Sequence, residues 1–156
     1  MRHKTFILVA VLLLVLVGGA VAAYAYDSSR DDLIAEGDTV LLAATRMHAA
    51  LAGQRLVATD FRVPRFATAD LSGQTVREVA ARGKHLLLRT DAGTTLHTHF
   101  KMEGAWHLYR PQERWRGPDF QVRAVLRTDP WVAVGFRLAI CELLPTANEH
   151  EVVGHL

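Results

Sequence analysis

The feature that most constrains this sequence is a series of short, alternating apolar segments separated by glycine-containing turns. Apolar and polar residues alternate in Thr75–Ala81 and in Phe120–Arg127, the pattern of a strand with one buried face. Arg82-Gly83 and Asp91-Ala92-Gly93 carry residues typical of turns between neighbouring strands. The pattern predicts strands over residues 54–61, 75–81, 84–89, 94–100, 104–109, 120–127, 131–136 and 138–144. Many short strands with regular turns indicate a β-sandwich or a barrel.

One amphipathic helix precedes these strands, over residues 38–53. Asp38 or Thr39 can cap its N-terminus, and Gly53 can end it. One face of this helix is apolar and carries Val40, Ala43, Ala44, Met47 and Leu51. We therefore expect a mainly β, α+β domain, a two-layer β-sandwich flanked by one or two helices.

The first part of the chain has a different character. Phe6–Tyr26 is a run of 21 residues without a charge, which as a helix at ~1.5 Å per residue spans about 31 Å, the thickness of a bilayer core. Basic residues precede the run and Asp27 follows it, which favours a cytoplasmic N-terminus and an exported remainder. We predict an N-terminal hydrophobic helix that contacts a membrane through residues 6–26. Residues 1–26 are either an uncleaved signal anchor or a signal peptide cleaved near Ala23-Tyr24-Ala25, and residues 27–35 are a junction.

Length and composition limit the remainder. The chain has 156 residues, enough for one domain with a substantial core. Residues 55–127 carry 13 Lys and Arg against 7 Asp and Glu, which is compatible with a polyanion partner and equally with an ordinary solvated surface. Cys141 is the single cysteine, so the chain can form neither an internal disulfide nor a thiolate zinc site. Its apolar surroundings predict a small core residue.

Three stretches carry a family resemblance. They are Glu36-Gly37-Asp38-Thr39-Val40 at the start of the helix, Arg82–Leu87 on a hairpin and Leu96–Trp106. In this order and spacing they resemble the N-terminal catalytic domain of the formamidopyrimidine-DNA glycosylase and endonuclease VIII family, most closely its actinobacterial endonuclease VIII-type members. The resemblance covers residues 36–156 and includes Tyr109–Gly117.

The resemblance implies a base-excision repair enzyme, a bifunctional DNA glycosylase and AP lyase acting on damaged double-stranded DNA. In that family an N-terminal proline amine attacks the sugar C1′ and an adjacent glutamate transfers protons, while the damaged base is everted from the stack. The chemistry needs a free amine, and an α-amino group titrates near ~7.7–8.0, so an appreciable fraction is nucleophilic at neutral pH.

The resemblance also implies roles for individual residues. Glu36 matches the acid/base glutamate, and Lys84 matches the hairpin lysine on the phosphate or sugar side of the lesion, so both are candidate catalytic residues. His99 and Met102 match the loop that touches the backbone phosphate and fills the gap left by the everted base. Charge alone adds Arg123 as a DNA contact, together with Arg110, Arg114 and Arg116. Without the resemblance, Glu36 is an ordinary helix N-terminal carboxylate, Lys84 a solvated turn residue and Met102 a core residue.

His97 and His99 stand two residues apart, so they point to the same face of a strand. A metal site is a rival interpretation, but no third ligand stands at a recognisable spacing. We predict no metal, no cofactor and a monomer.

The sequence departs from the family pattern at the expected nucleophile. Ala35 occupies the position of the proline, and its nitrogen is in a peptide bond with Ile34. An amide nitrogen is not nucleophilic because its lone pair is delocalised. The family also continues into a helix–two-turn–helix unit and a four-cysteine zinc finger, and we expect the 36–156 domain to lack both. The resemblance therefore implies a glycosylase with impaired activity.

Two other interpretations stay open. One is a non-catalytic, membrane-tethered β-sandwich module. The other is the product of a chimeric reading frame, because residues 24–37 resemble the start of actinobacterial envelope proteins. If the chain is an envelope protein of that kind, its function lies in the anchor. The N-terminal segment predicts a membrane-anchored or exported protein, whereas a glycosylase would act in the cytoplasm.

Overall fold

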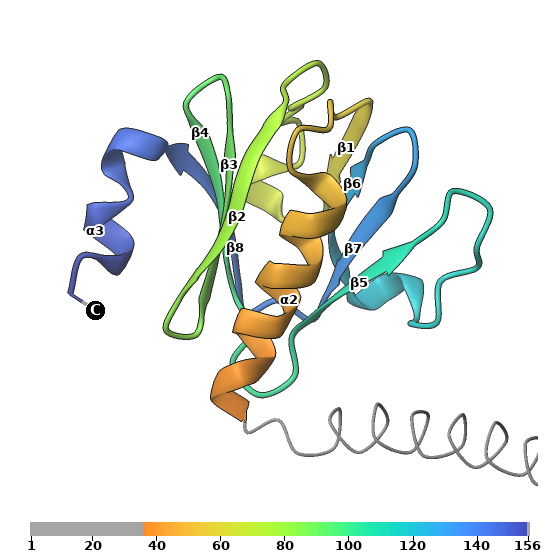
Figure 1. Cartoon of the computed structure of the whole chain (residues 1–156). Helices are drawn as coiled ribbons and strands as arrows, with labels where there is room; N and C mark the ends of the chain where they lie inside the picture. The colour runs from red at the N-terminus through yellow and green to blue at the C-terminus, as the bar shows by residue number, and fades with distance from the viewer. Residues whose placement is uncertain (1–35, 156) are drawn as a thin grey trace, which may run out of the picture. The chain divides into compact units, whose positions relative to one another are not determined.

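Eight strands and two α-helices make up the part of the chain that the computed structural model describes, residues 36–155 (Figure 1). They are, in chain order, α2 (Glu36–Leu51), β1 (Ala58–Phe61), β2 (Val76–Arg82), β3 (His85–Thr90), β4 (Thr94–His99), β5 (Ala105–Tyr109), β6 (Val122–Arg127), β7 (Val132–Phe136), β8 (Ile140–Pro145) and α3 (His150–Val153). Three short 3₁₀ helices connect them, η1 (Pro64–Phe66), η2 (Asp119–Gln121) and η3 (Thr146–Asn148).

The strands form two antiparallel four-stranded sheets with the orders β1-β6-β7-β5 and β2-β3-β4-β8. In the second sheet, β2, β3 and β4 follow one another through tight turns, and β8 adds to β4 from later in the chain. In the first sheet, β1 pairs with β6, so the sheet joins segments that are far apart in sequence. Figure 1 shows α2 lying beside both sheets, in contact with β2, β3 and β5.

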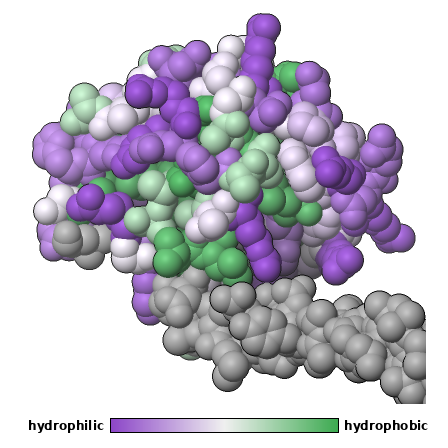
Figure 2. All heavy atoms as spheres, in the orientation of Figure 1, coloured by the Kyte–Doolittle hydropathy of each residue, from purple (hydrophilic) through white to green (hydrophobic). Residues whose placement is uncertain are grey.

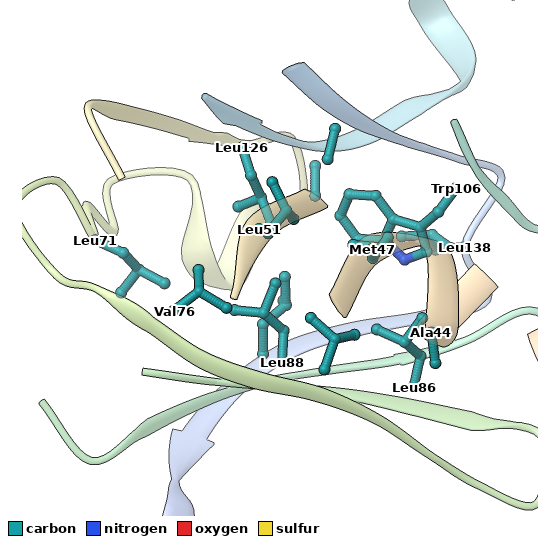
Figure 3. Packing of buried hydrophobic residues seen from close by; sticks show 14 of the residues in the cluster. Ala44, Met47, Leu51, Leu71, Val76, Leu86, Leu88, Trp106, Leu126 and Leu138 are labelled. Carbon is teal, nitrogen blue, oxygen red and sulfur yellow. The ribbon is translucent and has the colours of Figure 1, made fainter. Parts of the chain in front are cut away.

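The main core lies where α2 and the inner faces of both sheets meet. Ala44, Met47 and Leu51 of α2 are buried and belong to one cluster with side chains of both sheets (Figure 3). The second sheet contributes Leu86, Leu88 and Leu96, and the first contributes Ala124, Leu126 and Ala133. The alternation of these strands is therefore the alternation between this core and an outer face.

A second, smaller cluster covers the outer face of the first sheet. It contains Tyr109, Val122, Val125, Val132, Val134 and Phe136, with Trp115 packed against it. Trp115 belongs to the connection between β5 and β6, so this connection covers the sheet. Every residue of β7 is buried for that reason, since one face meets the main core and the other meets this cluster.

The outer face of the second sheet is polar and holds the C-terminal elements. Arg89 on β3 donates two hydrogen bonds of 2.7 Å to the carboxylate of Glu149 and also pairs with Glu78 on β2. Thr95 Oγ1 donates to the same Glu149 at 2.6 Å. These bonds fix Glu149, which directly precedes α3, against the sheet.

The predicted fold is confirmed as a sandwich, and the barrel alternative is wrong. The helix predicted over 38–53 spans Glu36–Leu51, and the predicted strands follow in the right order. The strand predicted over 54–61 is too long, because β1 begins at Ala58 and Arg55 forms only an isolated bridge with Thr75. Residues 52–57 instead lead the chain from the end of α2 to the sheet, and they turn at Gly53, whose φ is +79°.

The predicted hydrophobic helix at residues 6–26 and the junction at 27–35 lie outside the described residues. Neither helix within residues 36–155 has the length and hydropathy of a membrane span. The predicted contact with a membrane stays a prediction.

Candidate functional site

Three segments that carry the sequence motifs converge on one small pocket of about 60 Å³. The first turns of α2 contribute Thr39 and Val40, the β2–β3 hairpin contributes Lys84, and the β4–β5 loop contributes Phe100, Lys101, Met102 and Gly104. We call this hollow the Lys84 pocket. The first and the last of these segments are about half the described domain apart in sequence, and the fold brings all three to one place.

Lys84 stands at the tip of a two-residue hairpin turn. Arg82 and His85 are paired, so only Gly83 and Lys84 connect β2 to β3. Gly83 has φ +57°, a conformation that glycine adopts without the steric cost of a side chain. The Lys84 side chain is exposed and lines the pocket, so its ammonium group is available to an anion.

The β4–β5 loop is tight and presents Met102 to solvent. Phe100 is buried and anchors the loop, while Met102 is 87% exposed. The Gly104 N–H donates to Phe100 O at 2.9 Å, and a Cβ at position 104 would lie 2.7 Å from that oxygen, so glycine is required there. Lys101 has φ +49°, and a left-handed non-glycine residue costs about 1–3 kcal/mol. The loop therefore holds a large apolar side chain in water at an energetic cost.

His99 ends β4 beside this loop. The Lys101 N–H donates to His99 Nδ1 at 3.0 Å, which leaves Nε2 as the protonated, donating nitrogen of a neutral ring. Burial lowers the pKa of His99, and the nearby His97, Lys101 and Lys84 lower it further. At neutral pH this imidazole is an uncharged hydrogen-bond donor.

A histidine chain continues from His99 across the outer face of the second sheet. The His85 ring lies edge-on to His99, with centroids 4.5 Å apart, and its Nδ1 is 2.7 Å from His97 Nε2. The buried His97 is 2.7 Å from Glu142 through Nδ1. The predicted shared face of His97 and His99 is confirmed, but the partners His85 and Glu142 were missed because they depend on strand register. Within residues 36–155, no group of three His, Cys, Asp or Glu side chains is arranged to hold a metal ion.

A larger cavity of about 470 Å³ adjoins the Lys84 pocket, since Thr39 and Phe100 line both. Its walls are mainly apolar side chains, Leu42 and Met47 of α2, Trp106 and Leu108 of β5, and Trp131 just before β7, with Arg46 of α2 among them. Figure 2 shows apolar surface between hydrophilic residues on the face of the molecule that it displays. The two adjoining hollows thus place Lys84 and Lys101 next to mainly apolar walls.

Glu36 and Ala35 stand at the limit of the described chain. Helix α2 begins at Glu36, as the motif predicts, but the Glu36 side chain and all of Ala35 lie outside the described residues. Their predicted roles stay predictions.

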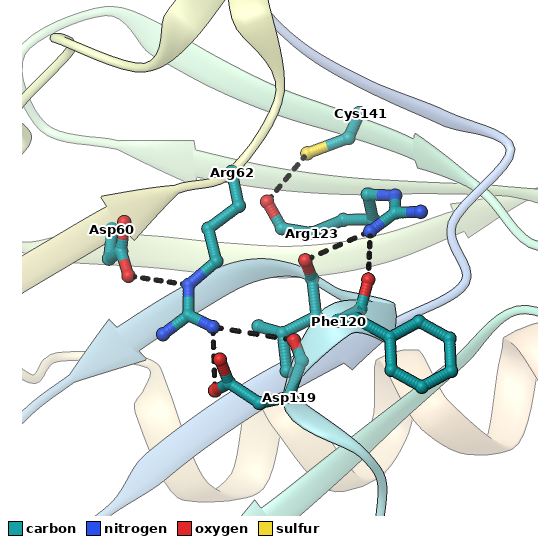
Figure 4. Close-up of polar contacts among 7 residues, drawn as sticks. Asp60, Arg62, Asp119, Phe120, Arg123 and Cys141 are labelled. Carbon is teal, nitrogen blue, oxygen red and sulfur yellow. Dashed lines mark hydrogen bonds and ion pairs between the residues drawn. The ribbon is translucent and has the colours of Figure 1, made fainter.

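Arg123 is not among the residues that line the Lys84 pocket. Its Nη1 donates to Phe120 O at 3.0 Å and to Val122 O at 3.2 Å, which closes the turn at η2 (Figure 4). Arg62, which directly follows β1, holds the same turn, because its guanidinium pairs with the carboxylates of Asp60 and Asp119 at 2.8 Å each. The structure gives Arg123 a local structural role, and its predicted contact with DNA stays a prediction.

Comparison with known proteins places this geometry in a family. The profile of the formamidopyrimidine-DNA glycosylase N-terminal domain matches residues 34–138. A probable endonuclease 8 of Streptomyces coelicolor is 52% identical over 122 residues, which are 78% of this chain and 44% of that protein. A DNA-(apurinic or apyrimidinic site) lyase of Mycolicibacterium smegmatis is 42% identical over 78% of this chain and 46% of its own. The chain therefore spans about half the length of the curated relatives that it matches.

The fold has solved relatives too. The crystal structure of Lactococcus lactis formamidopyrimidine-DNA glycosylase, non-covalently bound to DNA containing an abasic site, superposes with a TM-score of 0.63. The superposition covers 76% of this chain and 47% of that chain at 17% identity, so it supports the sandwich fold.

Proposed function

Because the chain belongs to the formamidopyrimidine-DNA glycosylase family, we propose that its sandwich domain binds double-stranded DNA at damaged or abasic positions. Binding takes place where α2, the β2–β3 hairpin and the β4–β5 loop meet. The domain then acts where the chromosome is, in the cytoplasm. The convergence of the three motif segments on the Lys84 pocket is the observation that carries this proposal.

Each side chain around the pocket suits one part of damaged DNA. The Lys84 ammonium is a compact cation for a backbone phosphate, and the neutral His99 donates a hydrogen bond from Nε2. Met102 is large, apolar and exposed, so it can enter the stack where a base is missing and recover the cost of its own exposure.

The lyase chemistry of the family is blocked in the chain as written. The Ala35 nitrogen is an amide, so it cannot attack C1′ or form an iminium. Glu36, the proposed proton-transfer residue, then has no neighbouring amine to serve. We propose a domain that retains recognition of damaged DNA and has lost the amine-dependent step.

The binding part is tested with a fluorescent duplex that carries one abasic-site analogue, compared with the same undamaged duplex. We expect tighter binding to the abasic duplex, and Lys84→Ala should reduce the slope of log K against log salt by ~1. Arg77→Ala is the matched control, because it removes an exposed cation of β2 that does not line the pocket. Equal affinity for both duplexes would refute the recognition of damage.

The chemical part is tested by borohydride trapping on DNA with an abasic site. The full chain should give no covalent adduct, whereas a chain that starts at position 35 with Ala35→Pro has the free secondary amine and is the comparator. An adduct with the full chain would show that our account of the nucleophile is wrong. Repeating the reaction with Lys84→Ala would then show whether the Lys84 amine had formed it.

A further inference from the structure

A second pocket borders the β4–β5 loop and is lined by two arginines. It has a volume of about 180 Å³, and its lining residues include Glu103, His107, Arg116, Gly117 and Arg137. Because the loop contributes Met102 to the Lys84 pocket and Glu103 to this one, the two pockets are neighbours. We call it the Arg116–Arg137 pocket.

The backbone of Arg116 is fixed by the sheet that it covers. The Arg116 N–H donates to Tyr109 Oη at 3.2 Å, and Tyr109 is buried in the outer cluster of the first sheet. The next residue, Gly117, lies so close to the sheet that a Cβ there would be 2.4 Å from the ring of Phe136. The β5–β6 connection is therefore packed tightly against the sheet at Arg116 and Gly117.

The backbone of Arg137 is fixed in a strained conformation. It has φ +50°, and Lys101 is the other non-glycine residue with a positive φ within residues 36–155. The Arg137 N–H donates to Gln121 O at 2.8 Å, and the Ala139 N–H donates to His99 O at 2.9 Å. The β7–β8 loop is thus tied to η2 on one side and to the end of β4 on the other. Strain of this kind persists where surrounding contacts impose it, and it gathers at binding sites.

Within the part of the chain that the structure describes, the guanidinium groups of this pocket have no partner, unlike those of Arg62 and Arg89. Arg62 and Arg89 are paired with carboxylates, whereas Arg116 and Arg137 make no side-chain hydrogen bond or ion pair with any described residue. Burial and then the charge of Arg116 lower the pKa of His107, so its imidazole adds no positive charge at neutral pH. Glu103 is the one carboxylate among the lining residues, which leaves the pocket with a net positive charge.

We propose that the Arg116–Arg137 pocket is an anion site that binds a phosphate group through two guanidinium groups. Planar guanidinium donors match phosphate oxygens, and two of them at one pocket bind a phosphate more strongly than one. On the proposed function the group is a phosphodiester of the bound DNA, a second backbone contact beside the one at Lys84. The two contacts then lie on neighbouring pockets, with the exposed Met102 on the loop that they share.

The proposal is tested first with inorganic phosphate, in the full chain kept in a non-ionic detergent. The arginine Nε–H resonances are followed by NMR during the titration. Arg116 and Arg137 should shift at lower phosphate concentration than Arg114, which is exposed in the same connection and lines none of these pockets. Arg137→Ala should also weaken the response of Arg116. If Arg114 responds together with Arg116 and Arg137, the anion site does not exist.

The second arm uses the duplex with an abasic analogue and separates the source of the phosphate. Arg116→Ala and Arg137→Ala should each reduce the salt slope of DNA binding by ~1, and Arg77→Ala should not. If phosphate selectively shifts the Arg116 and Arg137 resonances but the protein does not bind DNA, the anion site is supported and the proposed function is refuted. The ligand of the site would then be a free phosphate compound. DNA binding whose salt slope is unchanged in both variants would refute the phosphodiester contact.

Discussion

Gly117 gives the sharpest test of how the β5–β6 connection is held on the sheet. A Cβ at position 117 would lie 2.4, 2.8 and 3.0 Å from three carbon atoms of the Phe136 ring. Phe136 is buried between valines of the outer cluster, so its ring has little room to move. Overpacking of this kind costs about 1–3 kcal/mol, and we expect Gly117→Ala to lower the free energy of unfolding by that amount.

The assay is urea unfolding of four proteins that form a double-mutant cycle: wild type, Gly117→Ala, Phe136→Leu and the double variant. Phe136→Leu leaves space where the new Cβ would point, so the double variant should be more stable than the sum of the single effects predicts, by about 1 kcal/mol or more. Costs that add to within ~0.5 kcal/mol would refute the steric argument.

The control substitution is Gly104→Ala, whose Cβ would contact the backbone of Phe100 at 2.7 Å rather than a ring. Phe136→Leu should not rescue it. In the salt-dependence assay, Gly117→Ala should also reduce the slope, because a displaced loop moves Arg116.

Three further results are expected. Burial raises the pKa of Glu149, but hydrogen bonds from Arg89 and Thr95 outweigh burial and hold the pKa below its usual value. Glu149→Gln should therefore destabilise the protein above about pH 4.3, the pKa of an unperturbed glutamate. The difference in unfolding free energy between wild type and variant should shrink as the pH falls through the folded pKa. A difference that grows on acidification would contradict this. Burial raises the pKa of the Cys141 thiol to about 12, so a thiol-specific reagent at pH 8 should label it only in denaturant; rapid labelling of the folded protein would be inconsistent with its environment. Leu88→Ala should cost about 2–5 kcal/mol in urea unfolding, because Leu88 is fully buried, whereas the exposed Leu41→Ala should cost far less.

Much of the fold could be predicted from local patterns. The alternation in residues 120–127 and the turn at Gly83 specify strands and a hairpin with little help from the rest of the chain. The boundary of β1 could not be predicted, since residues 54–57 are as apolar as a strand but connect α2 to the sheet. The helix end at Leu51 precedes the predicted one because the chain turns before Gly53.

The site residues likewise fall into those that the sequence could predict and those that depend on the fold. Lys84, His99 and Met102 were found because each belongs to a motif within a few residues of chain. Arg137 belongs to no motif, and its importance depends on a positive φ and on contacts with η2 and β4 that the sequence does not reveal. The chain from His85 through His97 to Glu142 likewise depends on the register of three strands.

The pairing of β1 with β6 also sets the order in which the sandwich can form. β2, β3 and β4 are joined by short turns, so their pairing closes small loops and can begin early. β1 has to wait for residues 122–127, more than 60 positions later, before it finds its neighbour in the sheet. On a ribosome the apolar Phe61 therefore emerges long before its partner strand. Until β6 is made, β1 stays unpaired, so it is a segment exposed to misassociation during synthesis.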